Sequence, residues 1–286
     1  MHTIYISDLD GTLINSQAEL SGYARANLRE LLADGLPFTV ASARSIVSIK
    51  QILRGLDLSL PVICFNGAFI SDLQSGRHEI VNAMQSEVAD GIYALLPDYN
   101  CIPFLSTYTG AEEKVFYNEV TNAGMEWFVQ ERFLREDPRF SKTSNLREGL
   151  AHQVMCMTIV NRKEILDDLE QDIAERFGDK IEMHHFENEY SPGWYWLTIH
   201  DARASKDQAV VTLKSHCGLA DSRIVAFGDH GNDSKMLRAA DHGIAVANAK
   251  PQAMQHADEV IGSNLEDGVV NYLLRQGRGD DITTLR

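Results

Sequence analysis

Short apolar segments alternate with amphipathic segments at both ends of the 286-residue chain. The amphipathic segments have helical spacing, and the apolar ones have the length and composition of buried strands. Alternation of strand and helix implies a parallel sheet with helices on both faces, so we expect an α/β fold. The predicted strands lie at 3–7, 37–42, 61–66, 223–228, 242–247 and 258–262.

The first helix is predicted over 18–35, where leucines recur at helical spacing. Gly35 should end it, and Ser16 with Glu19 has the pattern of a capping box at its start. A strand, this helix and the next strand therefore form one unit of the expected sheet.

The alternation breaks off between the two ends of the chain. From about 84 to 192, helical segments and alternating strands follow one another in a pattern of their own. Because a connection of about 110 residues is rare and usually functional, we predict an inserted domain. The predicted division is a core of 1–83 and 193–286 and an α+β cap of 84–192, with a strand at 194–200 assigned to the core.

Composition and charge exclude several kinds of partner. The formal net charge is −15 and no Lys/Arg cluster is present, which argues against nucleic acid. No apolar run approaches the ~20 residues that span a bilayer, so no membrane partner is expected. Four widely spaced cysteines without a CxxC pair, and an N-terminus without the features of a signal peptide, favour a cytoplasmic protein.

Two aspartates, Asp8 and Asp10, come directly after the first strand. Ligand sites of open α/β sheets lie outside the carboxyl ends of the strands, and residues i and i+2 of a strand face the same way. Both carboxylates could then point into one crevice, where their repulsion favours a divalent cation such as Mg²⁺ between them. Gly11 permits a tight turn, whose amides can face a phosphate.

A second acidic loop follows the strand at 223–228. It contains Asp229, Asn232 and Asp233, and thus repeats the design of an apolar strand that ends in carboxylates. Aspartate is also common at the start of a helix, but two such strand ends in one sheet can form a cation site that neither forms alone.

Three further segments bear groups that suit a phosphate. Lys206 falls in the first turn of a predicted helix with Ser205 as N-cap, where a cation opposes the helix dipole unless an anion lies nearby. The second strand ends in Ser42, Ala43 and Arg44, which offer a hydroxyl, an amide and a guanidinium. Asn66-Gly67 after the third strand predicts a tight turn.

Other site patterns are absent from the sequence. It has no GxxxxGK[ST], GxGxxG, HExxH or GxSxG motif. The ten histidines show no spacing typical of metal ligands, and His184-His185 is interpreted as part of a strand. The acidic strand ends therefore remain the main candidate site.

Taken in order, DLDGT, the strand-end serine, the lysine and GDxxND make the sequence resemble the haloacid dehalogenase-like (HAD) superfamily, in particular the Cof-type phosphatases of subclass IIB. The segments at 65–68 and 263–270 also resemble Cof-type signatures. The resemblance implies a Rossmann-like parallel-sheet core with an inserted cap of type C2B. It further implies a Mg²⁺-dependent phosphoric monoester hydrolase acting on a small phosphorylated metabolite, in particular a sugar phosphate. We expect the chain to be a monomer or a homodimer.

The resemblance also assigns roles to residues. Asp8 would be the nucleophile that forms an aspartyl-phosphate, and Asp10 the general acid and base. The metal would be bound by the carboxylates of Asp8 and Asp229 and the backbone carbonyl of Asp10, with Asp233 as a further ligand or as a partner of the ligands. The phosphate or substrate would be bound by Leu9, Ser42, Ala43, Arg44, Asn66, Gly67, Lys206 and Asn232, of which Asn232 would touch the phosphate or orient Lys206.

Two departures and two alternatives accompany the resemblance. Ala43 stands where the family usually has glycine, and "AVANA" at 245–249 replaces "AMGNA".

A phosphomutase or other phosphotransferase would use the same aspartyl-phosphate. A non-catalytic regulator that binds a phosphorylated metabolite is the second alternative, because a fold alone does not define an activity.

Overall fold

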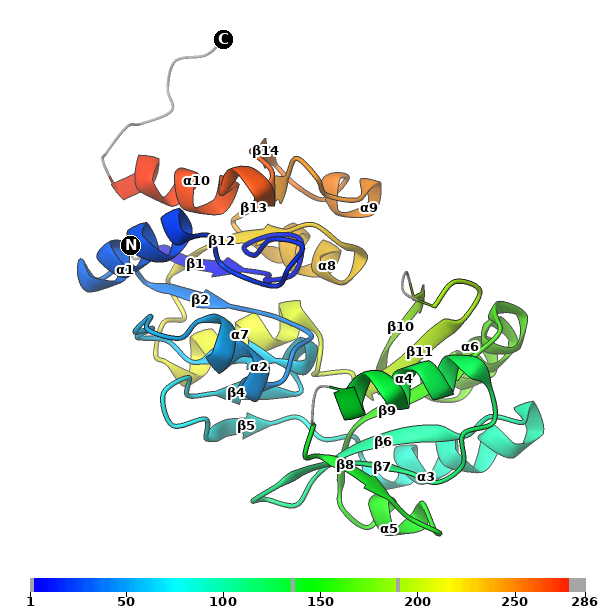
Figure 1. Ribbon diagram of the computed structural model, residues 1–286. Helices are drawn as coiled ribbons and strands as arrows, with labels where there is room; N and C mark the ends of the chain where they lie inside the picture. Colours follow the sequence, from blue (N-terminus) through cyan, green and yellow to red (C-terminus); the bar gives the residue numbers. More distant parts are fainter. Residues whose placement is uncertain (1–2, 135–136, 189–190, 278–286) are drawn as a thin grey trace. The chain divides into compact units, whose positions relative to one another are not determined.

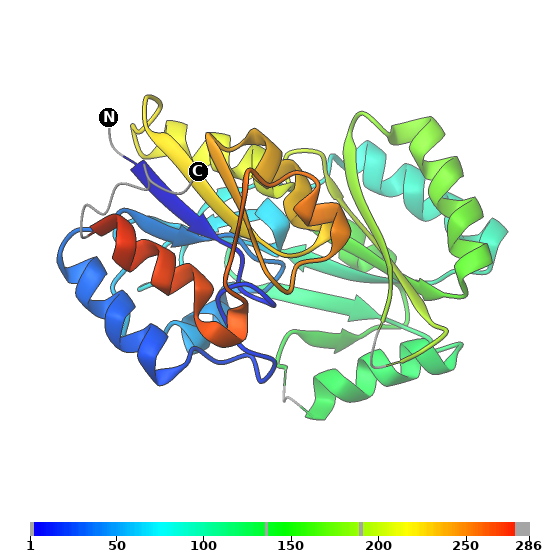
Figure 2. The same ribbon diagram turned by 90° about the horizontal axis from the view of Figure 1, so that it is seen from above.

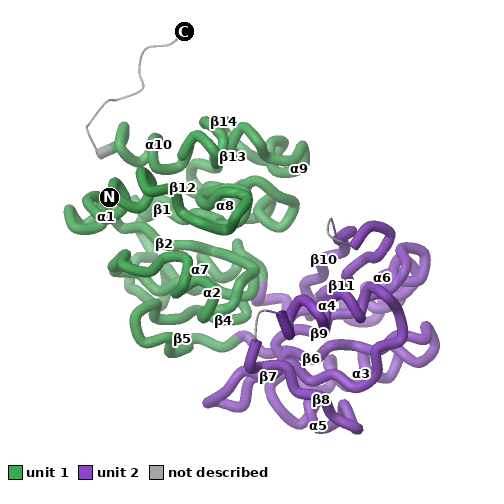
Figure 3. The backbone as a smooth tube through the Cα atoms, viewed as in Figure 1, with its two compact units in different colours: residues 1–81, 205–286 green, residues 82–204 purple. Residues whose placement is uncertain are grey.

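The computed structural model describes residues 3–134, 137–188 and 191–277, which form two compact units (Figure 3). The core unit comprises residues 1–81 and 205–286, and the cap unit residues 82–204. Figure 1 labels the elements of both. In the described residues, no helix has the length and apolar character needed to cross a membrane.

The core unit contains a parallel sheet of order β14–β13–β12–β1–β2. An isolated parallel bridge from Ala41 to Ile63 extends it toward the antiparallel strands β3–β4–β5. Its strands are β1 (Thr3–Ser7), β2 (Phe38–Val40), β3 (Val62–Cys64), β4 (Phe69–Ser71), β5 (His78–Val81), β12 (Arg223–Gly228), β13 (His242–Val246) and β14 (Glu259–Ile261). Its helices are α1 (Gly22–Ala33), α2 (Ile46–Ile52), η1 (Phe65–Gly67), α7 (Lys206–His216), η3 (Gly231–Asp233), α8 (Ser234–Ala239), α9 (Pro251–Met254), η4 (Asn264–Glu266) and α10 (Gly268–Gly277).

The core sheet is covered on both faces, as the alternation predicts. Helices α1 and α10 lie side by side on one face, and α7 and α8 lie on the other (Figure 2). The chain runs from β1 to β2 in one direction along the sheet and from β12 to β13 in the other. The adjacent strands β1 and β12 therefore form the switch point where α/β sheets bind ligands.

The start of α1 differs from the prediction. The helix begins at Gly22, and its N-cap is Ser21, whose hydroxyl accepts a hydrogen bond from the amide of Ala24. The predicted capping box of Ser16 and Glu19 is wrong, because the Asn15 side chain accepts the amide of Glu19 in a turn before the helix. A local hydrogen bond thus takes the amide that the capping box needed.

The cap unit is an α+β layer with the sheet order β10–β11–β9–β6–β7–β8. Its strands are β6 (Pro103–Tyr108), β7 (Glu113–Tyr117), β8 (Phe140–Lys142), β9 (Gln153–Asn161), β10 (Ile181–Glu187) and β11 (Tyr195–Asp201). Its helices are α3 (Ser86–Leu95), η2 (Leu96–Tyr99), α4 (Ala123–Leu134), α5 (Arg147–Leu150) and α6 (Lys163–Phe177). Side chains of α3 and α6 pack with one face of the sheet, and those of α4 with the other.

The second domain boundary lies later than predicted. Strand β11 pairs with β10 and β9, so the segment at 194–200 belongs to the cap sheet and the compact units divide after Ala204. Leu197 and Ile199 join one hydrophobic cluster of the cap, and Trp196 joins the cluster on the opposite face. The alternation along β11 suits a sheet covered on both faces, and it does not reveal which sheet the strand joins.

Candidate active site

The first acidic strand end places its two aspartates in different surroundings. Asp8 directly follows β1 and is buried, whereas the Asp10 side chain is half exposed. The carbonyl of Leu9 accepts hydrogen bonds from the amides of three residues, Thr12 to Ile14, and so turns the chain away from the strand direction. Strand periodicity therefore ends at Asp8, and the expectation that both carboxylates face one cation does not match this geometry.

Asp10 lies against Arg44 instead. The Arg44 guanidinium donates to both Asp10 oxygens, at 2.7 Å from Nε and 2.6 Å from Nη2. Arg44 also donates through Nη1 to Ser48 at 3.0 Å. Because such a two-bond fork fixes orientation as well as distance, Arg44 positions the Asp10 carboxylate at the edge of the site.

The second acidic loop comes beside Asp8, because β12 is the parallel neighbour of β1. Asp8, Asp229 and Asp233 are all buried, and one oxygen from each lies within 4.8 Å of the others. Asp233 also accepts the amides of Asp229 and His230 at 3.0 Å, which holds the loop in shape. The structure thus brings together the three predicted carboxylate ligands, and the side chain of Asp10 stays outside this group.

Lys206 supplies the positive charge of this cluster. Its side chain is fully buried at the start of α7, and Nζ donates to Asp8 Oδ1 and to Asp233 Oδ1, both at 2.6 Å. Ser205 precedes the helix as predicted, but its hydroxyl makes no capping hydrogen bond. A lysine in the first turn is therefore explained by the anions that it faces.

The electrostatics of the cluster favour an additional cation. Burial raises the pKa of Asp8 well above its usual range, and the carboxylate of Asp233 raises it further, while Lys206 opposes the shift. Burial, followed by Asp233, also raises the pKa of Asp229. Burial alone would lower the pKa of Lys206, but Asp233 and Asp8 outweigh it and raise this pKa. One ammonium thus faces three carboxylates, and negative charge remains in excess.

Gly11 makes this arrangement sterically possible. It has a φ of +74°, and a Cβ at this position would lie 2.4 Å from Asp229 Oδ2. The absence of a side chain lets the turn after β1 approach the second acidic loop. Three clustered carboxylates with oxygen donors alone suit a hard divalent ion, so the residues present could hold a metal.

Ser42, Asn66 and Asn232 lie in three loops that hydrogen bonds join to one another. Ser42 is buried after β2, its hydroxyl accepts the Arg44 amide at 3.2 Å, and its carbonyl accepts the Asn66 amide at 2.9 Å. Asn66 has a left-handed φ of 55°. Its side-chain oxygen accepts from Asn232 at 3.1 Å, so Asn232 contacts Asn66 here and no hydrogen bond joins it to Lys206 in the described part of the chain.

Leu9, Ala43 and Gly67 contribute little through their side chains. Leu9 is fully buried in the core, Gly67 has a φ of +111° in the turn η1, and Ala43 is exposed between Ser42 and Arg44. Any role of these residues in binding a phosphate therefore depends on their backbone.

Two residues that hold the site were missed by the sequence analysis. Thr12 donates through Oγ1 to Asp229 Oδ1 at 2.9 Å, and Asn248 donates through Nδ2 to the Gly11 carbonyl at 2.7 Å. Thr12 is the last residue of the DxDGT motif, so the motif itself contained the indication. Asn248 lies in the turn after β13, and its role follows from a contact across 237 residues.

Comparison with known proteins identifies the family of this chain. The family model of haloacid dehalogenase-like hydrolases matches residues 5–273. A putative phosphatase of Haemophilus influenzae is 26% identical over 275 residues, which cover 96% of this chain and 97% of that protein. The pyridoxal phosphate phosphatase YbhA of Escherichia coli is 25% identical over 275 residues, which cover 93% and 95%.

Solved structures show the same fold. A haloacid dehalogenase-like hydrolase from Bacteroides thetaiotaomicron superposes with a TM-score of 0.76 at 24% identity, covering 96% of this chain and all of that one. The HAD subclass IIB sugar phosphatase BT4131 superposes with a TM-score of 0.72 at 20% identity, covering 97% and 99%. The fold is thus a Rossmann-like core with an inserted α+β cap, and the chain belongs to the haloacid dehalogenase-like hydrolase family.

Proposed function

We propose that this phosphatase of the HAD-like family depends on Mg²⁺ and hydrolyses a small phosphorylated metabolite, in particular a sugar phosphate, through an aspartyl-phosphate on Asp8. The observation that carries the proposal is the buried group of Asp8, Asp229 and Asp233 around Lys206, at the switch point of the core sheet. Transfer of a phosphoryl group to an aspartate needs positive charge beside the attacking carboxylate, and here Lys206 together with a divalent ion held by the carboxylates would supply that charge.

The oxygen ligands for Mg²⁺ would come from Asp8, Asp229 and Asp233, together with the backbone carbonyl of Asp10. When bound, the ion supplies positive charge to the phosphoryl oxygens and so lowers the cost of bringing an anion to a carboxylate. Thr12 holds Asp229 in place for this role, because its hydroxyl occupies one carboxylate oxygen.

The phosphoryl group would be held mainly by Lys206. The Ser42 hydroxyl and the backbone amides around Leu9 and Ala43 would add neutral donors. Asn66 and Asn232, which hydrogen-bond to each other, would border the leaving group together with Gly67. The chain's net charge of −15 makes this local supply of donors necessary for an anionic substrate.

The proposed reaction has two steps. An oxygen of Asp8 attacks phosphorus, the bond from phosphorus to the leaving oxygen breaks, and Asp10 donates a proton to that oxygen. Asp10 then takes a proton from water, whose oxygen attacks phosphorus and releases inorganic phosphate and free Asp8. Since Arg44 holds both Asp10 oxygens, this fork must open before Asp10 reaches a substrate.

The substrate class is supported by the names of relatives. YbhA of Escherichia coli is named as a pyridoxal phosphate phosphatase. YitU of Bacillus subtilis, which is 24% identical over 274 residues, is named as a phosphatase of 5-amino-6-(5-phospho-D-ribitylamino)uracil. Both names describe small phosphate monoesters, and a structural neighbour is described as a sugar phosphatase. A small phosphorylated metabolite is therefore the best-supported class for this chain.

A panel of phosphorylated metabolites, with detection of inorganic phosphate, tests the proposal. We expect phosphate release from at least one sugar phosphate with Mg²⁺ and none after chelation. Isomerisation that requires a bisphosphate primer, without phosphate release, would support a phosphomutase. Binding of a phosphorylated metabolite without any turnover would support a regulator.

A further inference from the structure

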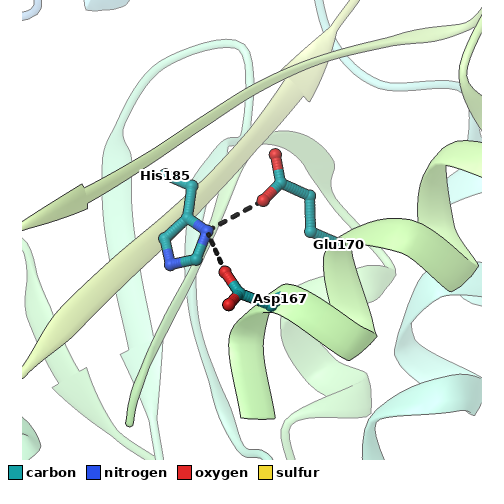
Figure 4. A group of neighbouring side chains, drawn as sticks. All are labelled: Asp167, Glu170 and His185. Atoms are coloured by element: carbon teal, nitrogen blue, oxygen red, sulfur yellow. Dashed lines mark hydrogen bonds and ion pairs between the residues drawn. The ribbon is translucent and has the colours of Figure 1, made fainter. Parts of the chain in front are cut away.

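A second group of potential metal ligands lies wholly within the cap unit. Asp167 and Glu170 are three positions apart on α6, so both side chains lie on the same side of the helix. His185 comes from β10, and one nitrogen of its ring faces both carboxylates (Figure 4). Helix and strand thus offer three donor atoms to one point.

The distances suit a common ion. His185 Nδ1 lies 2.8 Å from Glu170 Oε2 and 3.6 Å from Asp167 Oδ1, and all three donor atoms lie within 4.8 Å of one another. Two ligands at the usual distance of ~2.0–2.2 Å from Zn²⁺ are separated by at most ~4.4 Å. Small rotations of the carboxylates would therefore bring all three donors onto one ion.

The site is anchored on one side and open on the other. The His185 side chain is 11% exposed and packs edge-on to Tyr195, whereas those of Asp167 and Glu170 are 47% and 36% exposed. Three protein ligands with an open side leave room for water as a further ligand. The buried Nε2 has no hydrogen-bond partner in the described residues, so the polar contacts of His185 that orient its ring are these two carboxylates.

We propose that Asp167, Glu170 and His185 bind a divalent transition-metal ion, with Zn²⁺ as the best fit, and that this ion joins α6 to β10. An imidazole nitrogen among the donors favours Zn²⁺ over Mg²⁺ or Ca²⁺, which prefer oxygen alone. Binding through Nδ1 leaves the ring proton on Nε2, which has no acceptor, so we expect moderate affinity. This site is separate from the carboxylate cluster of the core and does not depend on the proposed catalytic function.

A lysine competes with the ion for one ligand. Lys163 Nζ donates to both oxygens of Asp167, at 2.8 and 2.7 Å. A metal must displace this ammonium, because the same carboxylate cannot be fully shared by both cations. Removing the lysine should therefore tighten metal binding, although it removes an ion pair of the apo cap.

Calorimetric titration of Zn²⁺ into the full chain, with excess Mg²⁺ to occupy the oxygen-only site of the core, tests the proposal. We expect one Zn²⁺ per chain that binds the wild type and binds His185→Ala at least about tenfold more weakly, since even outer partners of metal ligands contribute 10–100-fold. The same Zn²⁺ should raise the melting temperature of the wild type more than that of His185→Ala.

His242→Ala is the matched control. His242 also faces an aspartate and a glutamate, but Asp258 lies 3.8 Å from Nδ1 and Glu259 lies 3.0 Å from Nε2. Because its carboxylates lie at opposite ring nitrogens, they cannot share one ion with it. His242→Ala should bind Zn²⁺ as the wild type does.

Lys163→Ala gives a second, independent result. If Asp167 is a metal ligand, Lys163→Ala frees its carboxylate, and the Zn²⁺ affinity should increase several-fold. If the pair of Lys163 and Asp167 is only a surface ion pair, Lys163→Ala should leave the Zn²⁺ affinity unchanged. Equal Zn²⁺ binding by the wild type and His185→Ala would overturn the proposal, and so would unchanged or weaker binding by Lys163→Ala.

Discussion

The core and the cap each contain a cluster of acidic side chains beside a lysine, and the two clusters differ in burial. In the core, Asp8, Asp229 and Asp233 are buried around the ammonium of Lys206. In the cap, Lys163 and its partner Asp167 are about half exposed, and water screens both charges. Buried charge must be balanced by protein or metal, whereas exposed charge need not be, so the same pairing of residue types has different consequences.

Replacing one carboxylate in each cluster should give the largest difference between core and cap, measured as turnover. Asp8→Asn removes the proposed nucleophile, and we expect turnover to fall by at least about 10⁴-fold. Asp167→Asn makes the same chemical change in the cap and should leave turnover without added Zn²⁺ within about twofold of wild type. Steady-state phosphate release measures both, and a folded Asp8→Asn protein with substantial activity would rule out the aspartyl-phosphate route.

Removal of the lysine from each cluster should give the next largest difference, which is a difference in the free energy of unfolding. Lys206→Met leaves three buried carboxylates without their ammonium, and we expect a loss of about 3–5 kcal/mol in the free energy of unfolding. Lys163→Met removes an exposed pair and should cost below about 1 kcal/mol. Urea unfolding of each variant without metal measures the difference. If Lys206→Met loses as little unfolding free energy as Lys163→Met is expected to lose, Lys206 is not essential to the charge balance of the core.

The core cluster was largely predictable from the sequence, because each of its parts is local. A short apolar strand followed by DxDGT or GDxxND specifies both the strand and the residues at its end, and parallel pairing brings the ends together. The orientation of Asp10 could not be predicted, since the turn depends on how the carbonyl of Leu9 is used. Its pairing with Arg44 adds a contact across 34 residues.

The cap cluster was not predictable for a physical reason. Asp167 and Glu170 have the pattern of a solvated helix face, and His185 lies on a strand without a second histidine nearby in ligand spacing. Only the packing of α6 against β10 determines which helical residues face the ring. Strand β11 was assigned to the core for the same reason, because its alternation does not identify its neighbours.

Acidification should change the two units in opposite directions when no metal is present. His200 is buried in the cap, where its Nδ1–H donates to the carbonyl of Met155, and burial followed by the charge of His184 lowers its pKa to about 3. Protons bind the unfolded state more readily between about pH 6.5 and 3, so the cap should lose on the order of a few kcal/mol across this window. Burial raises the pKa of Asp8 and Asp229, so the core should gain stability as pH falls through their raised values.

Hydrogen exchange of the metal-free protein, followed separately for core and cap amides, measures this inversion. His200→Gln is the matched variant, because it keeps a hydrogen-bond donor for Met155 and does not titrate in this range. We expect a flatter pH dependence of cap protection in His200→Gln and an unchanged one in the core. Parallel loss of protection in both units would contradict the assignment of the pH dependence to these buried groups.

The smallest effect concerns how the core cluster is held. Thr12→Val removes the hydroxyl that donates to Asp229 Oδ1 but keeps the shape of the side chain. Because partners of metal ligands typically contribute 10–100-fold to affinity, we expect Mg²⁺ activation to shift to about tenfold higher concentration. At saturating Mg²⁺ the turnover should recover to near the wild-type rate, since Thr12 has no proposed contact with the substrate. A persistent loss of turnover in Thr12→Val at saturating Mg²⁺ would mean that the hydroxyl acts on the substrate rather than on Asp229.

In the cap, Tyr195→Phe alters a ring that packs against His185 without a hydrogen bond to it, so Zn²⁺ affinity should be nearly unchanged.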